Sequence, residues 1–453
     1  MKRLAPLVYA AISLCLLRSA PPGFGQQTGQ TTTLGTQTPS AVNAQQAAEN
    51  QSGGSGLTWE QLKARFEANN PSLKADALGV EESRAQEITA HLRPNPQFTF
   101  ATDGTQLTPH NGVWSPFAGT QYQSNLSYLW ERDNKRNLRL ETAKDATHVA
   151  ESSHEDLERN LLFTLRGAFV QTLQAKAVVK LAEDDLAYYD KIIEISRSRF
   201  HAGDIAQVDL DRIELQRVQY ESELQTAKVN LRTAKIQLLQ LLNDRTPVDN
   251  FDVQGLFDFS PDLKQLEDFR QTALDNRPDL RAALQTIEES KAAHKLAVSN
   301  GSTDPTFAGW WTYDGSYNNP NAENALGLSI TMPLRIFDRN QGEKKRTQID
   351  IDKSTESSET TRAQVFSDVD SAYAQVDSNI ILLKPYKDKY VQQSTRVRDT
   401  VTYAYQHGGA SLTDFLNAQS DYRVVQLAYL QLIGTYLTAA SQLNLAVGRE
   451  VIQ

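Results

Sequence analysis

The residues with the clearest potential for chemistry are His148, Glu151 and His154, whose types are those of metal ligands. On a helix, their spacing of three and three residues turns the last side chain about 240° away from the first, so no single face holds all three. The sequence contains no Ser/His/Asp set, phosphate-binding loop or HExxH motif. Its carboxylate pairs are ordinary features of helix surfaces. We therefore expect no enzymatic activity, no bound metal and no cofactor.

The N-terminal residues are typical of an exported protein. Residues 1–25 begin with Lys2 and Arg3, continue with an apolar run and end in small residues, which is the order of a secretory signal peptide. The run is shorter than the ~20 apolar residues of a membrane-spanning helix, which disfavours the alternative of a retained anchor. Cys15 lies within the run and is the only cysteine, so the mature chain has no disulfide, and lipidation at Cys15 is the less favoured alternative.

The composition excludes nucleic-acid binding and membrane-spanning helices. The net charge is −9 and becomes more negative once the basic signal peptide is removed, and there are no basic blocks to bind nucleic acid. Residues 26–56 are rich in Gln, Thr, Ser, Gly and Ala and are predicted to be a disordered leader. No later segment has 18 consecutive apolar residues. An exported chain of this kind is either periplasmic or inserted into a membrane as β-strands.

The mature sequence is a duplication. Residues 70–75 (NPSLKA) return as residues 277–282 (RPDLRA), and residues 200–203 (FHAG) return as residues 405–408 (YQHG). After each glycine, two heptad patterns match residue for residue at an offset of 205: Leu224, Ala227, Leu231, Ala234, Leu238 and Leu241, and Tyr429, Leu432, Tyr436, Ala439, Leu443 and Ala446. Such spacing predicts coiled-coil packing of long helices.

Each copy, residues 57–260 and residues 261–453, is predicted to contain a helix, two strands, a very long helix, a tight turn and a further helix. The strands are expected where alternation with a period of two replaces the helical pattern, at residues 97–102, 121–130, 306–313 and 325–332.

The long helices are expected over residues 135–200 and 341–405. Two shorter helices are expected end to end beside each of them, over residues 71–92 and 208–242 in the first copy and residues 278–299 and 413–447 in the second.

Aromatic residues gather in the strand windows, as in the girdles of lipid-facing barrels. We predict such a girdle from Phe98, Phe100, Tyr128, Trp130, Phe307, Trp310, Trp311 and Tyr313. An aromatic-rich soluble hairpin is the alternative. Four strands alone would leave open edges in lipid, so several copies must complete one wall. We expect a homotrimer that is mainly α-helical, with a small 12-strand membrane β-barrel continued by a long α-helical coiled-coil tunnel.

Residues 405–419 (YQHGGASLTDFLNAQ) resemble the recurrent turn Y-x-x-G-x-x-S-x-x-D-x-L-x-A-Q of the TolC-like outer-membrane efflux proteins. The first copy keeps Phe200, Gly203 and Asp209, but has Ala206 where serine is usual and departs again at Arg212. The resemblance extends over the chain from Leu57. It implies a passive exit duct in the outer membrane of a Gram-negative-type envelope, with a periplasmic tunnel.

By the same resemblance, the partners are a periplasmic adaptor (a membrane fusion protein), an inner-membrane pump and outer-membrane lipid. Two alternatives stay open: a type I protein-secretion duct of the same fold, and a periplasmic adaptor or coiled-coil scaffold. Residues 93–96 (RPNP) and 333–342 (PLRIFDRNQG) are similar to the branch that works with cobalt-zinc-cadmium pumps, although Arg335 and Ile336 are inserted before Phe337. The sequence therefore favours metal efflux without identifying the substrate.

The two turns are the candidate functional sites. We expect positive φ at their glycines, and the resemblance implies periplasmic tips that dock an adaptor through Phe200, Gly203, Tyr405, Gly408 and Ser411. The acids after the turns either cap the next helix or line a cation-attracting pore constriction. These acids are Asp209 and Asp414, with Asp204 as a further candidate that has Gly409 in its place in the second copy.

Overall fold

The structure is a computed structural model that describes residues 56–314 and 323–452. They belong to one compact unit, Ser55–Gln453. The predicted signal peptide and residues 26–55 of the predicted leader lie outside the described residues, as do residues 315–322.

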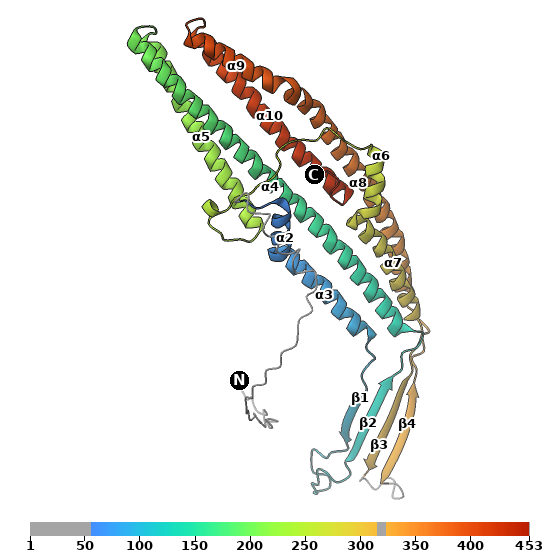
Figure 1. Cartoon of the computed structure of the whole chain (residues 1–453). Helices are drawn as coiled ribbons and strands as arrows, with labels where there is room; N and C mark the ends of the chain where they lie inside the picture. Colours follow the sequence, from blue (N-terminus) through green and yellow to red (C-terminus); the bar gives the residue numbers. More distant parts are fainter. Residues whose placement is uncertain (1–55, 315–322, 453) are drawn as a thin grey trace, which may run out of the picture. The chain divides into compact units, whose positions relative to one another are not determined.

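Each repeat contributes its own set of elements (Figure 1). The first repeat contains α2 (Trp59–Asn69), α3 (Pro71–His91), β1 (Gln97–Asp103), β2 (Gln121–Leu129), α4 (Lys135–Ala202) and α5 (Gln207–Leu241). A short 3-10 helix, η1 (Val248–Asn250), follows. The second repeat contains α6 (Leu266–Asn276), α7 (Pro278–Ser299), β3 (Thr306–Asp314), β4 (Asn324–Thr331), α8 (Gln341–Pro385), the π-helix η2 (Tyr386–Tyr390), α9 (Val391–Gln406) and α10 (Leu412–Val447).

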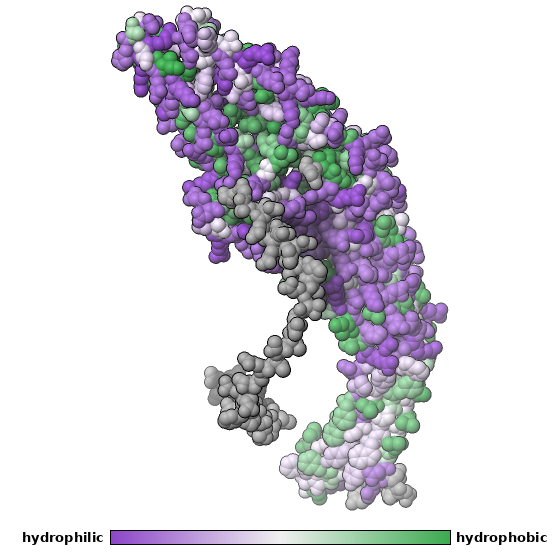
Figure 2. Space-filling model, viewed as in Figure 1, coloured by the Kyte–Doolittle hydropathy of each residue, from purple (hydrophilic) through white to green (hydrophobic). Residues whose placement is uncertain are grey.

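The four strands form one antiparallel sheet in the order β1-β2-β3-β4. The two repeats meet at its centre, where β2 pairs with β3 and Leu126 lies opposite Gly309. Because side chains alternate along a strand, one face collects exposed apolar residues (Figure 2). They are Phe98, Phe100, Leu126, Phe307, Trp311, Tyr313, Leu326, Leu328 and Ile330.

Trp310 does not belong to this apolar face, which corrects its assignment to the girdle. Its register partners are Asn125 and Gly327, so it lies on the opposite, mainly polar face. The indole packs against Gly327, where a Cβ atom would come within 2.2 Å of the ring. The prediction grouped Trp310 with Trp311 by proximity in sequence, although neighbours along a strand point to opposite faces.

The long helices pack side by side along most of their length. In the first repeat, α4 contacts both α3 and α5, and in the second, α8 contacts α7 and α10. The repeats also contact each other through α4, which packs against α7 and α10. None of the helices within residues 56–314 and 323–452 contains an apolar stretch that could span a bilayer.

The second long helix is interrupted, which corrects the expectation of one regular helix over residues 341–405. α8 ends at Pro385, and the π-helical turn η2 separates it from α9. Proline has no N–H group to donate and its ring crowds the preceding turn, which interrupts the regular α-helical ladder. The sequence-based interpretation took residues 341–405 as one helix and overlooked this proline.

The two repeats use equivalent positions to hold the joints between their stacked helices. The Asn70 side chain caps α3 by accepting from the backbone N–H groups of Ser72 and Leu73, and its Nδ2 donates to the Leu241 carbonyl at 3.2 Å. In the second repeat, Arg277 occupies the position of Asn70 and its Nη1 donates to the carbonyl of Ala446 at 3.3 Å. Leu241 and Ala446 are themselves equivalent heptad positions.

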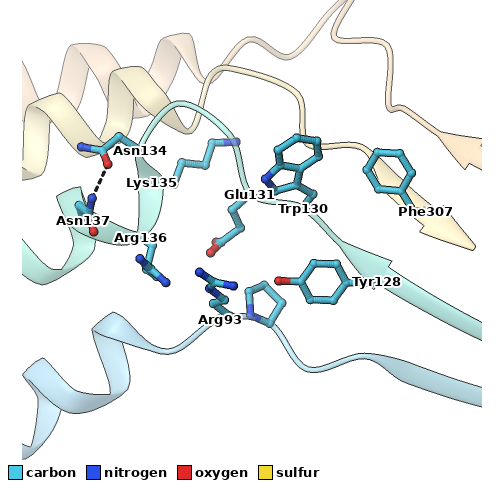
Figure 3. Close-up of a pocket in the computed structure, with 10 residues that line it drawn as sticks. Arg93, Tyr128, Trp130, Glu131, Asn134, Lys135, Arg136, Asn137 and Phe307 are labelled. Atoms are coloured by element: carbon cyan, nitrogen blue, oxygen red, sulfur yellow. Dashed lines mark hydrogen bonds between the residues drawn. The ribbon is translucent and has the colours of Figure 1, made fainter.

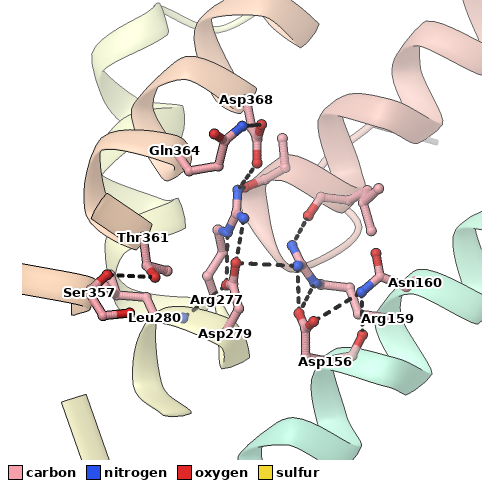
Figure 4. A network of polar contacts seen from close by, with 12 residues as sticks. Asp156, Arg159, Asn160, Arg277, Asp279, Leu280, Ser357, Thr361, Gln364 and Asp368 are labelled. Atoms are coloured by element: carbon pink, nitrogen blue, oxygen red, sulfur yellow. Dashed lines mark hydrogen bonds and ion pairs between the residues drawn. The ribbon is translucent and has the colours of Figure 1, made fainter. Parts of the chain in front are cut away.

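Arg277 differs from Asn70 in anchoring a network of charges (Figure 4). Its side chain is 4% exposed and contacts Asp279 at 2.5 Å and Asp368 at 2.8 Å. Asp279 also lies 3.7 Å from Arg159, whose Nη1 donates to the Leu445 carbonyl at 2.5 Å. The network thereby joins α4, α7, α8 and α10.

We expect Arg277→Ala to lower the free energy of unfolding by about 3–5 kcal/mol, because Asp368 loses its arginine partner and Asp279 keeps only the more distant Arg159. The matched change Asn70→Ala removes only a neutral cap and should cost about 1–2 kcal/mol. Thermal unfolding in detergent, followed by far-ultraviolet circular dichroism, compares the two variants. Equal shifts of the apparent Tm would contradict a special role for the charged network.

Candidate functional site at the two helix turns

Both turns between long helices are closed by the same backbone motif. After α4, Gly203 has φ 82° and donates to the Phe200 carbonyl at 3.0 Å, while the next N–H, of Asp204, donates to Arg199 at 2.9 Å. After α9, Gly408 has φ 78° and donates to Tyr405 at 3.2 Å, and Gly409 donates to Ala404 at 2.7 Å. This pair of bonds is the Schellman motif, in which glycine supplies the left-handed residue. The expected positive φ values are present at both glycines.

The turns differ in how the next helix begins. Ser411 and Asp414 form a capping box at α10: Ser411 Oγ accepts from the Asp414 N–H at 3.1 Å, and Asp414 Oδ2 accepts from the Ser411 N–H at 3.2 Å. Ala206 has almost the same extended backbone before α5 but no side-chain oxygen to offer. The departure from the family pattern at Ala206 therefore leaves one helix end without its cap.

This difference separates the candidate acids. The Asp414 carboxylate accepts hydrogen bonds from the hydroxyl and the backbone N–H of Ser411. These bonds hold the pKa of the Asp414 carboxyl below its usual range. Asp209 occupies the equivalent position in the first turn of α5, and its carboxylate has no hydrogen-bond or ion-pair partner among the described residues. Asp204 is exposed in the turn itself. Of the three candidates, Asp414 has the geometry of a cap, while Asp209 keeps a free charge.

An aromatic cluster behind the turns binds the two helix pairs together. Tyr189 lies 4.4 Å from Tyr220 and 6.3 Å from Phe415, measured between ring centroids, and Phe415 stacks on Tyr405 at 5.0 Å. Arg199 of α4 donates to the Tyr405 carbonyl at 2.7 Å. Tyr405 is only 5% exposed, which corrects its assignment as a docking contact. Its side chain supports the turn from inside, whereas Phe200 stays partly exposed.

The histidines first considered as metal ligands face different partners. His148 Nδ1 lies 3.3 Å from Glu151, whereas His154 Nδ1 lies 2.7 Å from Asp76 of α3. Residues 56–314 and 323–452 contain no group of three or more His, Cys, Asp or Glu residues that could hold a metal ion.

The girdle residues form two aromatic groups at opposite ends of the sheet. Trp130 and Phe307 lie 5.9 Å apart near the helices, beside Tyr128. At the far end, Tyr122 lies 6.5 Å from Phe100 and 6.3 Å from Tyr313. Tyr122 is a further aromatic residue of the predicted strand window 121–130 and belongs to this far group. Phe98 and Trp311 lie between the two groups on the same face.

A comparison with protein families identifies the family to which both repeats belong. The family model described as "Outer membrane efflux protein" matches this chain twice, over residues 64–244 and 269–449. The chain belongs to the outer membrane efflux protein family. It is an outer-membrane channel of a tripartite efflux system, and both matched segments include a long helix, its turn and the helix that follows.

Individual relatives agree with this membership. The cobalt-zinc-cadmium resistance protein CzcC of Cupriavidus metallidurans is 23% identical over 402 residues, which cover 87% of this chain and 90% of CzcC. The solved structure of CusC has a TM-score of 0.70 at 17% identity, covering 86% of this chain and 92% of CusC. The outer membrane protein VceC of Vibrio cholerae has a TM-score of 0.69 at 15% identity, with coverages of 86% and 96%. The predicted channel fold is thereby confirmed.

Behind the turns of this efflux protein lies a buried carboxyl group that the sequence analysis missed. Asp185 of α4 is 7% exposed, and its Oδ2 has no hydrogen-bond partner among the described residues. Two cations face it from the other repeat. Arg398 lies 4.0 Å above the Tyr422 ring, and Arg423 is paired with Glu223. Burial raises the pKa of Asp185 to about 6, since the two arginines offset only part of the lost hydration.

Asp185 should make the stability of the efflux protein depend on pH. A carboxyl with a raised pKa holds its proton more tightly when folded than when unfolded, so stability falls as pH rises from 3.8 to about 6. Asp185→Asn should therefore raise the free energy of unfolding at pH 8, by up to ~3 kcal/mol, and change it little at pH 4. The measurement is the apparent Tm against pH, with the exposed neighbour Asp184→Asn as the control. A pH-independent effect of Asp185→Asn would contradict the assignment.

Proposed function

We propose that three copies of this outer-membrane efflux channel join their sheets into one closed wall. The observation that carries the proposal is the four-stranded antiparallel sheet, which has an exposed apolar face and ends in two edge strands, β1 and β4. In a bilayer, the backbone groups of these edges would lack hydrogen-bond partners, and pairing β1 of one copy with β4 of the next supplies them. Twelve strands then enclose a lumen, and the helices continue it as a periplasmic tunnel.

The spacing of the aromatic groups supports a membrane position for the sheet. Tyr122 and Tyr128 are six residues apart on β2, which corresponds to about 20 Å along a strand. This is close to the ~25 Å height of the apolar band of outer-membrane barrels, whose aromatic girdles flank the band on both sides.

The free charge of Asp209 is proposed to contribute to a cation-attracting constriction at the periplasmic tips, with Asp204 beside it in the turn. Threefold copies of an unpaired carboxylate raise the local concentration of cations. The equivalent Asp414 is proposed to serve the helix instead, because its carboxylate already accepts hydrogen bonds from Ser411.

The channel is tested in planar bilayers with the detergent-purified protein, after native mass spectrometry has measured its oligomeric state. We expect trimers that conduct ions and prefer cations. Asp209→Asn should weaken this preference, measured as the reversal potential in a salt gradient, because it removes three charges while nearly preserving side-chain volume. Asp414→Asn is the matched control and should change the reversal potential less. A stable monomer, or identical effects of the two variants, would overturn the respective part of the proposal.

We further propose that the two turns dock a periplasmic adaptor, and that the exported substrates are divalent metal ions. The docking surface would include Phe200, Gly203, Gly408 and Ser411, which lie at or next to the two Schellman turns. The metal assignment rests on the similarity to CzcC, whose name states cobalt, zinc and cadmium resistance, and an acidic conduit is compatible with cationic cargo.

Gly408→Pro should abolish metal export and leave the strand region intact. Proline cannot adopt φ 78° and cannot donate to the Tyr405 carbonyl, so the tip is misdirected. Gly409→Ala is the matched control, since its added Cβ would meet no atom closer than 3.5 Å. The measurement is tolerance to zinc, cobalt and cadmium in a strain lacking the native chain. Full tolerance with trimeric Gly408→Pro would exclude docking at this turn, and no rescue by the unaltered chain would exclude metal export.

A further inference from the structure

A cavity of about 430 Å³ opens where the strands meet the helices (Figure 3). The link between α3 and β1 supplies Arg93 and Pro94 to its wall. β2, the start of α4 and the link between them supply most of the remaining residues, and Phe307 comes from β3. A volume of this size is typical of small-ligand sites, and the site includes Arg93 of the RPNP motif, to which the channel function assigns no role.

Two acidic groups at this junction, Glu131 and Asp304, are already paired with cations. Glu131 is held by Arg139, which also donates to the carbonyl of Leu92 at 3.3 Å. Asp304 accepts from the buried ammonium group of Lys135 at 2.6 Å, and the same Lys135 Nζ donates to Ser302 at 3.0 Å. Glu131 and Asp304 are thus each matched by one cation, and both pairs also connect neighbouring links. Asp133 has no cation partner among the described residues, but it is exposed and does not line the cavity.

Two guanidinium groups in the wall remain without a partner. The side chains of Arg93 and Arg136 make no hydrogen bond, ion pair or ring contact with any other residue in the part of the chain that the structure describes. In Figure 3 both side chains lie below Glu131, and Arg93 is the one nearer to Tyr128. Two uncompensated positive charges beside a cavity are a site for an anion, and the planar guanidinium matches phosphate oxygens in particular.

The surroundings restrict the kind of anion. The tilted ring pair of Trp130 and Phe307, 5.9 Å apart, and the Tyr128 side chain form the apolar side of the same cavity. Aromatic rings of this kind lie at the level of lipid headgroups, with apolar edges toward the acyl chains. The cavity therefore combines a cationic side for a headgroup with an aromatic side for the start of an acyl chain.

We propose that this cavity binds the phosphate group of an anionic phospholipid from the periplasmic leaflet, with Arg93 and Arg136 as its ligands. The inference rests on the proposed membrane position of the sheet, which sets the junction at the periplasmic boundary of the bilayer. A phospholipid fits better than free phosphate because the aromatic side of the cavity would otherwise face only water. Three such lipids would seal the junction of one trimer.

The test is native mass spectrometry of the purified full chain, titrated with phosphatidylglycerol or with phosphatidylcholine in the same detergent. We expect up to three phosphatidylglycerol molecules per trimer, bound more tightly than phosphatidylcholine. The double variant R93Q/R136Q should weaken phosphatidylglycerol binding at least about tenfold, since each guanidinium–phosphate hydrogen bond is charge-assisted. The variant R132Q is the matched control, because Arg132 is an exposed arginine of the same junction that does not line the cavity.

Each outcome decides the proposal. The proposal is supported if the affinity for phosphatidylglycerol falls at least about tenfold in R93Q/R136Q and stays within about threefold of the unaltered chain in R132Q. Equal losses in both variants would mean general attraction of anionic lipid to a basic surface and would overturn it, as would unchanged binding in R93Q/R136Q. The choice of a lipid would also be overturned if inorganic phosphate displaced phosphatidylglycerol and Trp130→Ala left phosphatidylglycerol binding unchanged. The aromatic side of the cavity would then contribute nothing to binding. A chain that enters no bilayer would instead refute the proposed membrane position.

Discussion

The structure depends on the antiparallel pairing of β2 with β3. This ladder extends from Gln121 opposite Asp314 to Leu129 opposite Thr306, and among the described residues it is the only strand pair that joins the two repeats. Because α4 follows β2 and α7 precedes β3, the same ladder places these two helices side by side. The two repeats therefore stay in contact beyond the sheet, through α4 and α7. A change of one residue in the register would exchange the apolar face for the polar one. The hydrogen bonds of one strand pair therefore determine both which face of the sheet is apolar and how the helices of the two repeats align.

The sequence was most informative where both copies carry the same residue type at corresponding positions. Glycines at corresponding positions indicated both turns, because only a residue that tolerates positive φ closes a Schellman motif without strain. Prolines at positions 71 and 278 similarly marked the starts of α3 and α7. The heptad residues Leu238 and Leu443 are both fully buried, as coiled-coil spacing predicts.

Features that depend on one copy or on distant contacts could not be predicted in this way. Asp185 has no acidic counterpart in the second copy, and its burial depends on tertiary packing around α4 that the sequence pattern does not indicate. Tyr405 fitted the turn motif, but the motif gives no information on whether its ring faces solvent or Phe415. The strand alternation was visible, yet the placement of Trp310 required the register with Gly327. Pro385 was visible in the sequence, but whether it ends, bends or merely widens a helix depends on what packs around it.

The π-helical turn η2 makes the two helical hairpins of one chain, α4–α5 and α8–α10, differ in the direction in which their side chains face. A π turn takes in more residues than an α turn, so every side chain of α9 is rotated relative to the stripe that α8 begins. α4 has no such insertion and keeps one phase from Lys135 to Ala202. In a threefold assembly, the ring of hairpin tips would then alternate between two kinds, three of each. A binding partner with six identical subunits would meet two inequivalent grooves, and would need either two modes of contact or a preference for one half of the ring.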